Sequence, residues 1–316
     1  MTIEDPEPLD IVEAPPRGSG RRRWITVTAV AIVIAALVVA LVRSWGRVSK
    51  YDWRLEPGWI VLGTLLILGA STFNGLAYCR SVEWLSPVHP GRALALSIWA
   101  RSLLARYVPG NLLMVVGRAV MFYDQGVPRG VTVAATVYEQ ALALGIATAG
   151  AVGYLALYGN PGDGRLLWLL AVVPLVLAGL HPVPFRRMSG WALAKFGRPP
   201  LETLFSGRQV GLLGLLYTVG TVPLVVGIWA LVRSAAGPEA GNPLEVGLAF
   251  LLAFVISFLV FVLPSGIGVR DGIFALALSR NLPGGVAIAV SVGLRFALIV
   301  IELIFVGLAV LAGRRR

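Results

Sequence analysis

Hydrophobic positions in this chain fall in long uncharged runs, and short polar or glycine- and proline-containing stretches separate the runs. A helix that crosses the hydrocarbon core of a bilayer needs about 20 consecutive apolar residues. The runs predict spanning helices at 24–42, 57–79, 131–158, 166–180, 209–232, 246–263 and 284–312. With the segments at 93–123 and 273–279, the pattern predicts an all-α polytopic membrane protein with about eight transmembrane segments, two of them broken or re-entrant.

The first break lies in 106–118, RYVPGNLLMVVGR, where Pro109 and Gly110 interrupt an apolar run between Arg106 and Arg118. Proline removes an amide donor, and lipid offers no partner for the freed carbonyl groups. Such a break is stable only inside protein or beside a water-filled cavity. We therefore expect this stretch to lie inside the bundle.

A second break follows at 263–272, LPSGIGVRDG, and has the same chemistry. Its proline and glycines are Pro264, Gly266 and Gly268, and Arg270 and Asp271 come directly after them. Paired broken segments in the two halves of a membrane protein indicate a transporter's central binding site. This pairing is the basis of the functional hypothesis.

Composition supports the membrane assignment, with 57% hydrophobic and 14% charged residues in 316 and a mean hydropathy of +0.81. One cysteine, Cys79, excludes an intramolecular disulfide framework, and two histidines, His89 and His181, argue against a metal cluster. We expect no metal and no cofactor. The net charge of +11 indicates contact with anionic lipid headgroups and a topology signal, and not nucleic-acid binding.

Charge at the chain ends predicts the domain organisation. Residues 1–23 are acidic and then basic and predict a disordered cytoplasmic tail, 24–312 form the membrane domain, and 313–316 are a basic cytoplasmic end. If 93–123 crosses the membrane, the basic connector 181–208 lies outside. If 93–123 is re-entrant, the connector lies inside and the region around Ile273 completes a crossing. We prefer the re-entrant topology.

Three arginines near the first break are candidates for binding a lipid phosphate, because the planar guanidinium matches that anion. Arg101, Arg106 and Arg118 are separated by 5 and 12 residues and do not share one helix face. The alternative is that they extend to the headgroup layer and set topology.

Glu139 lies inside an apolar helix, where a carboxylate costs roughly 2.5–3.5 kcal/mol on insertion scales. It is therefore expected to face the bundle interior and either pair with an arginine or take up a proton, with Arg118 and Arg270 as the natural partners. A static ion pair and a role in coupling or gating remain open.

Charged residues after the second break carry similar alternatives. A helix that begins near Gly268 directs its first amides at an anion, while Asp271 is a candidate cap for that helix. Arg295 and Glu302 are seven residues apart, about 10 Å along a helix, so each needs a partner elsewhere. An interhelical tie and a transport role are equally open for them.

The motifs YVPGNLLMVVGR, followed by Gly126 and Tyr138-Glu139-Gln140, and LPSGIGVRDG resemble the two signatures of the lysylphosphatidylglycerol synthase transmembrane-region family. The resemblance covers about residues 27–312. Where the family often has Glu-Arg, this chain has Glu139-Gln140. The resemblance implies a flippase-like membrane domain, which in multiple peptide resistance factors is linked to lipid translocation. Because the chain ends at Arg316, we expect no synthase activity.

These observations predict a translocator, not an enzyme, that moves an anionic phospholipid or lipid-linked sugar across a bacterial plasma membrane. Arg118 and Arg270 are expected to hold the phosphate, and Glu139 to balance their charge. The alternative is a non-transporting scaffold for a membrane enzyme that modifies lipids or transfers sugars. An enzyme acting on a lipid-linked substrate is disfavoured, because the sequence has no nucleophile elbow and no nucleotide-binding loop.

Overall fold

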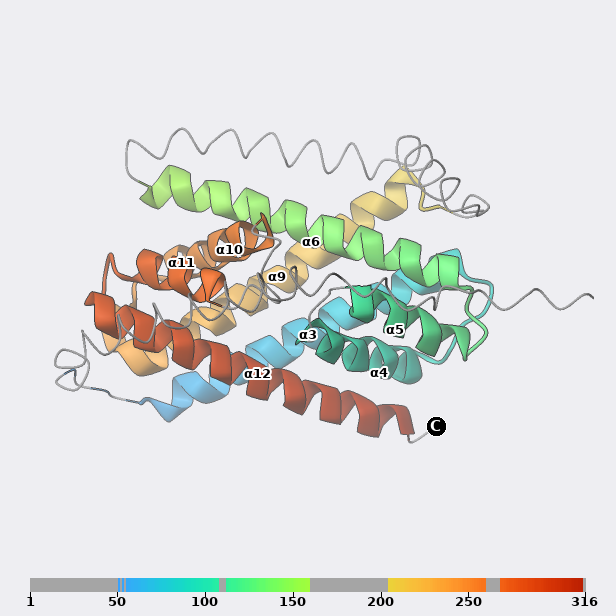
Figure 1. Ribbon diagram of the computed structural model, residues 1–316, viewed down its shortest axis with the longest axis horizontal. Helices are drawn as coiled ribbons and strands as arrows, with labels where there is room; N and C mark the ends of the chain where they lie inside the picture. Colours follow the sequence, from blue (N-terminus) through green and yellow to red (C-terminus); the bar gives the residue numbers. More distant parts are fainter. Residues whose placement is uncertain are drawn as a thin grey trace, which may run out of the picture.

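The computed structural model describes residues 51, 53, 55–107, 112–159, 204–259 and 268–314. Throughout this described part the regular elements are helices (Figure 1). The predicted tail 1–23, the spans 24–42 and 166–180, most of the connector 181–208, and the break residues Pro109, Gly110, Pro264 and Gly266 lie outside it.

Four α-helices precede the gap at 160–203. They are α3 (Pro57–Leu85), α4 (Arg92–Leu103), α5 (Leu112–Tyr123) and α6 (Arg129–Tyr158), with a 3-10 turn, η1 (Leu104–Tyr107), after α4. Pro57 begins α3 and Pro128 precedes α6. Proline suits these positions because the first amides of a helix have no partner within it.

Four α-helices follow the gap. They are α9 (Gly207–Ala236), α10 (Pro243–Leu259), α11 (Val269–Leu278) and α12 (Gly284–Arg314), with a 3-10 turn, η3 (Gly237–Ala240), after α9. The hydroxyl of Ser206 accepts from the Gln209 amide, and the Gln209 side chain accepts from the Ser206 amide at 2.8 Å. This reciprocal capping fixes the start of α9.

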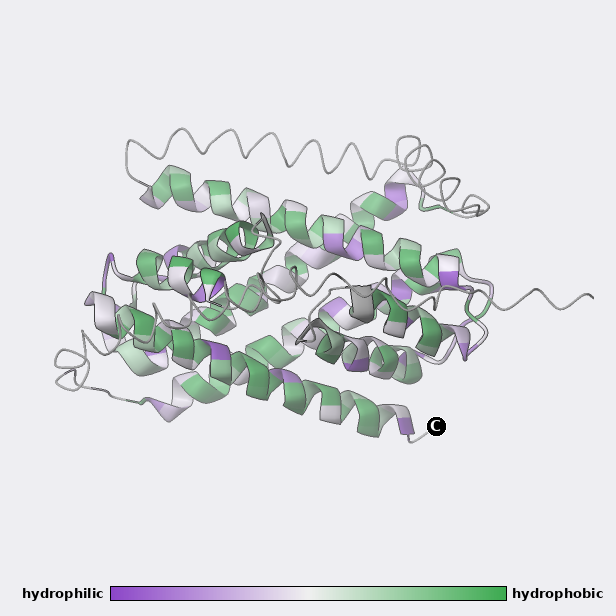
Figure 2. Cartoon of the chain, viewed as in Figure 1, coloured by the Kyte–Doolittle hydropathy of each residue, from purple (hydrophilic) through white to green (hydrophobic). Residues whose placement is uncertain are grey.

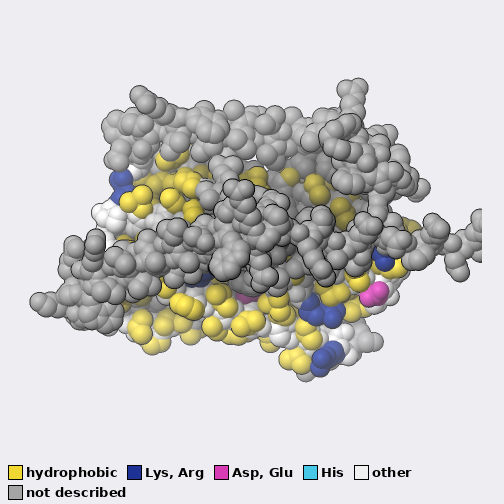
Figure 3. All heavy atoms as spheres, viewed as in Figure 1, with side chains coloured by type: hydrophobic (Ala, Val, Ile, Leu, Met, Phe, Trp, Pro, Cys, Tyr) yellow, Lys and Arg dark blue, Asp and Glu magenta, His cyan; other side chains and the backbone are white. Residues whose placement is uncertain are grey.

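Four helices of the described part, α3, α6, α9 and α12, are long and apolar enough to cross a membrane. Figure 2 shows hydrophobic residues along every helix, with hydrophilic ones at several helix ends and also part-way along α6 and α12. Figure 3 shows hydrophobic side chains over the region where α12 runs, and on α12 Phe296 is 66% and Leu311 57% exposed. Such an apolar outer face is expected of a helical membrane protein, as the sequence predicted.

The helices of the described part lie where the apolar runs predicted them, and several begin earlier or end later than predicted. Helix α3 continues past residue 79 to Leu85, and near its end Glu83 accepts hydrogen bonds from Arg80 and Arg92 at 2.9 and 3.0 Å. Helix α10 begins earlier than predicted, where the Asn242 side chain accepts from the Glu245 amide at 2.9 Å.

Helices α4 and α5 form a hairpin that enters and leaves the bundle at one end, where α3 ends and α6 begins (Figure 1). A Cβ on Gly126, just before α6, would lie 3.6 Å from Val88, just after α3. The two turns are therefore neighbours. The segment 93–123 thus reverses direction within the bundle, as the preferred topology predicted.

Helices α10 and α11 form a second hairpin at the opposite end (Figure 1). Asn281, after α11, donates to Glu245, at the start of α10, at 2.9 Å. The expectation that the region around Ile273 completes a crossing is therefore wrong. Helix α11 has 10 residues, which span about 15 Å, and it returns to the end from which α10 starts.

Helices α3 and α9 pack against each other through their glycines and run antiparallel. Gly63 faces Gly227 and Asn74 faces Gly220, so positions that rise along α3 fall along α9. Glycine lets two backbones approach closely, which is how helices commonly associate in membranes.

The remaining packing repeats in the two halves, α3–α6 and α9–α12. Helix α4 packs on α12 as its equivalent α10 packs on α6. Helix α5 packs on α6 as its equivalent α11 packs on α12. Because the equivalent helices α3 and α9 are antiparallel, the second half is inverted relative to the first. The bundle therefore has an approximate two-fold axis across the α3–α9 contact.

The sequence carries the same repeat at an ungapped separation of 155 residues. Identical residues occupy equivalent positions along the hairpins and the long helices that follow them. The pairs include Pro109/Pro264, Gly117/Gly272, Pro128/Pro283, Gly130/Gly285, Val131/Val286 and Val137/Val292.

Candidate functional site

The first polar cluster surrounds Arg118 on α5, whose side chain is fully buried. Its neighbours come from three other helices and each contributes a polar atom or an aromatic ring. They are Tyr78 on α3, Trp99 and Ser102 on α4, and Thr136 and Glu139 on α6. The hairpin and two spanning helices therefore meet at one charged side chain.

Arg118 forms an ion pair with Glu139, in which Nη1 donates to Oε2. The arginine Nε donates to Ser102 Oγ at 2.8 Å, and Nη1 also lies 3.4 Å from Thr136 Oγ1. The other carboxylate oxygen of Glu139 accepts from the Trp99 indole at 2.8 Å. The pair is thus hydrogen-bonded on both sides, which is the condition under which buried charges are tolerated.

The ring of Tyr78 covers the guanidinium of Arg118, 4.4 Å from its centroid. The Tyr78 hydroxyl lies 3.1 Å from Thr136 Oγ1 and donates to the Thr132 carbonyl at 3.3 Å. Cation–π contact strengthens when the cation is desolvated. Within the described part, Arg118 Nη2 is buried and forms no hydrogen bond, so the two N–H donors of this nitrogen are unused there.

The second polar cluster lies between α11 and α12. Arg295 on α12 pairs with Asp271 on α11, with Nη1 3.4 Å from both carboxylate oxygens. Asp271 also accepts from the Gly268 amide at 3.2 Å, and Ser291 donates to the Asp271 carbonyl at 2.8 Å. Gly268 has φ of 84°, a conformation that glycine adopts without strain. Asp271 thus caps α11, as the sequence predicted, and also holds Arg295.

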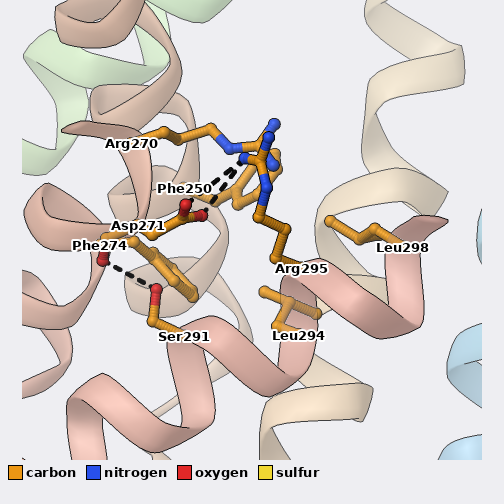
Figure 4. A pocket seen from close by; sticks show the side chains of 8 residues that line it. All are labelled: Phe250, Arg270, Asp271, Phe274, Ser291, Leu294, Arg295 and Leu298. Atoms are coloured by element: carbon orange, nitrogen blue, oxygen red, sulfur yellow. Dashed lines mark hydrogen bonds and ion pairs between the residues drawn. The ribbon is translucent and has the colours of Figure 1, made fainter. Parts of the chain in front are cut away.

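A small pocket opens at this second cluster (Figure 4). Its polar lining is Arg270, Asp271, Ser291 and Arg295, and its apolar lining is Phe250, Phe274, Leu294 and Leu298. The guanidinium of Arg270 lies 5.3 Å from the centroid of the Phe250 ring. The pocket therefore joins two cations and one carboxylate to an apolar wall.

The two clusters are equivalent in position and opposite in charge order. Thr136 and Ser291 occupy the same position of the repeat, and both carry a hydroxyl group. Each contacts the polar cluster of its own half. In the first half the arginine is on the hairpin and the carboxylate on the spanning helix. In the second half the carboxylate is on the hairpin and the arginine on the spanning helix.

The structure confirms that Glu139 faces the bundle interior and pairs with Arg118. Arg270 belongs to the second cluster, together with Asp271 and Arg295. The predicted need of Arg295 for a partner other than Glu302 is also confirmed, because that partner is Asp271. Arg118 and Arg270, which were expected to hold one phosphate together, therefore lie in two different clusters.

The other predicted residues lie elsewhere or outside the description. Arg101 is exposed and its Nε donates to the Ser97 carbonyl at 3.4 Å. Arg106 lies in η1, and Glu302 is half-buried on α12, away from the pocket lining. The positions of Pro109, Gly110, Pro264 and Gly266 are outside the described residues.

Sequence reasoning missed the uncharged residues that complete the clusters, namely Tyr78, Trp99, Ser102, Thr136 and Ser291. Single hydroxyl or aromatic residues in apolar helices are common and carry no signal alone. The sequence repeat does provide a signal, because a hydroxyl side chain recurs at Thr136 and Ser291 and again at Ser102 and Ser257.

The chain matches no protein-family model, and it has no significant match among characterised proteins. The resemblance to the lysylphosphatidylglycerol synthase transmembrane region therefore remains a prediction that rests on the two motifs.

Proposed function

We propose that this protein is a lipid translocator of the flippase-like kind, which moves the headgroup of an anionic phospholipid or lipid-linked sugar across a bacterial plasma membrane. The supporting observation is the inverted repeat with a buried charged cluster in each half, directly after each broken segment. Inverted repeats with discontinuous helices at their centre are typical of secondary transporters.

A polar lining inside the bundle meets the physical requirement of lipid translocation. A headgroup loses its water when it enters hydrocarbon, and hydrogen-bonding groups must replace that water. The two clusters supply arginine, serine, threonine and tryptophan donors at the places where the hairpins meet the spanning helices. We infer that the headgroup passes these two clusters in turn.

In this proposal the hairpins α4–α5 and α10–α11 are re-entrant segments that dip into the membrane from opposite surfaces. With the four described spans and the two predicted at 24–42 and 166–180, the chain has about eight membrane segments. The predicted connector 181–208 and both termini then lie on the same side, where α3 ends.

Charge favours placing this end in the cytoplasm. We call it the basic end; its described residues include five arginines and two acidic residues, Arg80, Arg92, Arg129, Arg208, Arg314, Glu83 and Asp124. At the opposite end the described charges are Glu56, Arg233, Glu239, Glu245 and Arg280. Loops rich in Lys and Arg stay cytoplasmic.

The test is lipid exchange between leaflets in liposomes that contain the purified protein and a headgroup-labelled anionic phospholipid. Wild type is expected to expose the inner-leaflet label to a membrane-impermeant quencher faster than empty liposomes do. Glu139→Gln is expected to slow this exchange, and Arg92→Gln, at an exposed side chain, is the matched control. A wild-type rate equal to that of empty liposomes, across several anionic and sugar-linked lipids, would reject the proposal.

A scaffold for a membrane enzyme remains the second candidate, because the Arg118–Glu139 pair ties α5 to α6 and can hold the bundle together. It predicts that Glu139→Gln lowers thermal stability while wild type itself moves no lipid. Because Glu139→Gln is expected to lower stability under either function, the wild-type exchange rate, measured on the same preparations, separates the two.

A further inference from the structure

We propose that the polar interior around Arg118, between α3, α5, α6 and α9, is a binding site for about two water molecules, which join the guanidinium of Arg118 to the hydroxyl of Tyr217 on α9. This inference goes beyond the proposed function, because the site can serve a translocator and a scaffold alike.

Three buried side chains of this interior carry a polar atom that forms no hydrogen bond within the described part of the chain. The atoms are Arg118 Nη2, Tyr217 Oη and Thr132 Oγ1. Tyr217 is 5% exposed, and the other two residues are fully buried. An unpaired buried polar group is costly, and native structures contain few of them. Three such atoms in one interior therefore indicate a ligand.

Tyr78 connects two of these residues directly. Its ring covers the Arg118 guanidinium, and its hydroxyl donates to the Thr132 carbonyl at 3.3 Å. The third residue, Tyr217, interacts electrostatically with Glu139, Tyr78 and Arg118. The three unpaired atoms therefore lie around the Arg118–Glu139 pair.

The packing of α3 on α9 places Tyr217 beside Tyr78. Asn74 Oδ1 occupies the place that a Cβ on Gly220 would need. Tyr78 is one turn after Asn74 on α3, and Tyr217 is one turn before Gly220 on α9. Because the two helices run antiparallel, both tyrosines lie at the same level. Asn74 Oδ1 is itself buried and unpaired in the described part, so it adds an acceptor to the site.

The chemistry of the unpaired atoms selects the ligand. Arg118 Nη2 only donates hydrogen bonds and Asn74 Oδ1 only accepts them, so a ligand that joins them must do both. An anion is disfavoured, because Glu139 already neutralises Arg118 and a further charge in the membrane interior is costly. A buried water makes about three hydrogen bonds, so the two N–H groups of Nη2, two hydroxyls and one amide oxygen correspond to about two waters.

Water at this place allows the ion pair to separate. Glu139 lies about 15 Å along α6 from Arg129, its first residue, which is about half the thickness of the hydrocarbon core. A charge exposed to hydrocarbon at this depth is costly. Bound water supplies hydrogen bonds to Arg118 and Glu139 when they part, so the α4–α5 hairpin can move relative to α6 without leaving either charge unsolvated.

The repeat confines the site to the first half. The positions equivalent to Arg118 and Thr132 are Ile273 and Ala287, whose side chains have no polar atom. In the second cluster, within the described part, no side-chain polar atom of Asp271, Ser291 or Arg295 is both buried and unpaired. The requirement for bound water is therefore particular to the first cluster.

X-ray radiolytic labelling of the protein in mild detergent, followed by mass spectrometry, tests the site. Radiolysis converts bound water into hydroxyl radicals, which oxidise the side chains in contact with it. Tyr78 and Tyr217 are expected to be oxidised several-fold faster than Tyr154, the matched control. Tyr154 is also 5% exposed and lies near the end of α6, so radicals from bulk water favour it. Equal or slower oxidation of Tyr78 and Tyr217 would show a dry interior and overturn the proposal.

The double variant Arg118→Met with Glu139→Leu replaces the charged lining by apolar side chains. It should lower the oxidation of Tyr217 to the rate of Tyr154, because the waters lose their partners. Unchanged oxidation of Tyr217 would overturn the proposal. Arg92→Gln, at an exposed arginine, is the matched control and should leave the rate as in wild type.

Tyr217→Phe provides a second measurement if the double variant fails to fold. It removes the hydroxyl to which the waters bond, so thermal unfolding in detergent should show a lower melting temperature. In a dry interior the same substitution removes an unpaired polar group. A melting temperature equal to or above that of wild type would therefore overturn the proposal.

Cys79 distinguishes bound water from opening of the bundle, because it follows Tyr78 on α3 and is 2% exposed. Oxidised tyrosines in a protein whose Cys79 resists maleimide support bound water, since maleimide is much larger than water. Reaction of Cys79 in the same detergent at the rate of the unfolded protein would mean that bulk water reaches the tyrosines, and it would overturn the proposal.

Discussion

Gly63 of α3 and Gly227 of α9 face each other across the approximate two-fold axis. A Cβ on Gly63 would lie 2.8 Å from the Gly227 carbonyl oxygen, and a Cβ on Gly227 would lie 2.9 Å from the Gly63 carbonyl oxygen. Each glycine thus permits the approach of the other helix's backbone, and the two halves of the bundle join here.

Gly227→Ala should therefore destabilise the bundle. Alanine normally stabilises a helix by about 0.5–1 kcal/mol relative to glycine, but here its methyl group meets backbone. Overpacking of this kind costs about 1–3 kcal/mol, so the net change should be a lower melting temperature. Thermal unfolding in detergent, followed by circular dichroism, measures it.

Gly211→Ala on the same helix is the control, because a Cβ there meets nothing within 4 Å. It should leave the melting temperature equal or higher. If both substitutions shift the melting temperature equally, the close α3–α9 contact does not limit stability.

The all-helical membrane class could be predicted from apolar run length, because lipid requires closed backbone hydrogen bonding. The pairing of Glu139 with Arg118 was also predictable, since a carboxylate in an apolar helix needs a partner. The choice between Arg118 and Arg270 was not, because it depends on which arginine-bearing helix, α5 or α11, packs against α6, and in the structure that helix is α5. The pairing of Arg295 with Asp271 likewise depends on tertiary packing, here of α11 against α12.

Glu139→Gln should lower stability by about 3–5 kcal/mol, because it leaves Arg118 buried without its counter-charge. The double substitution Arg118→Met with Glu139→Leu removes both charges and should recover most of this loss. Denaturation of wild type, Arg118→Met, Glu139→Leu and the double variant in a double-mutant cycle gives the coupling energy.

Losses that simply add in the double variant would contradict a direct interaction between Arg118 and Glu139. Arg80 and Glu83 provide the comparison, because their pair lies at an exposed arginine at the end of α3. Its coupling should be within about 1 kcal/mol of zero.

Cys79 should resist maleimide in the folded protein, because its side chain is 2% exposed on α3. It is the single cysteine of the chain, so the mass of the labelled protein reports on it alone. Labelling should occur in denaturing detergent and be negligible in mild detergent. Rapid labelling of the folded protein would show that the interior near Tyr78 opens to water.

The predicted orientation of the bundle can be tested with single cysteines in a Cys79→Ala background. Arg92→Cys marks the basic end, where α4 begins, and Glu239→Cys marks the opposite end, in η3. A membrane-impermeant maleimide should label Glu239→Cys on intact spheroplasts and should label Arg92→Cys only after permeabilisation, because arginine-rich loops are retained in the cytoplasm. The reverse pattern would invert the bundle, and labelling of both cysteines on intact spheroplasts would mean that the two turns share one side. That last result would contradict the inverted relation of the two halves, since the α3–α9 contact requires the turn after α3 and the turn after α9 to lie on opposite sides.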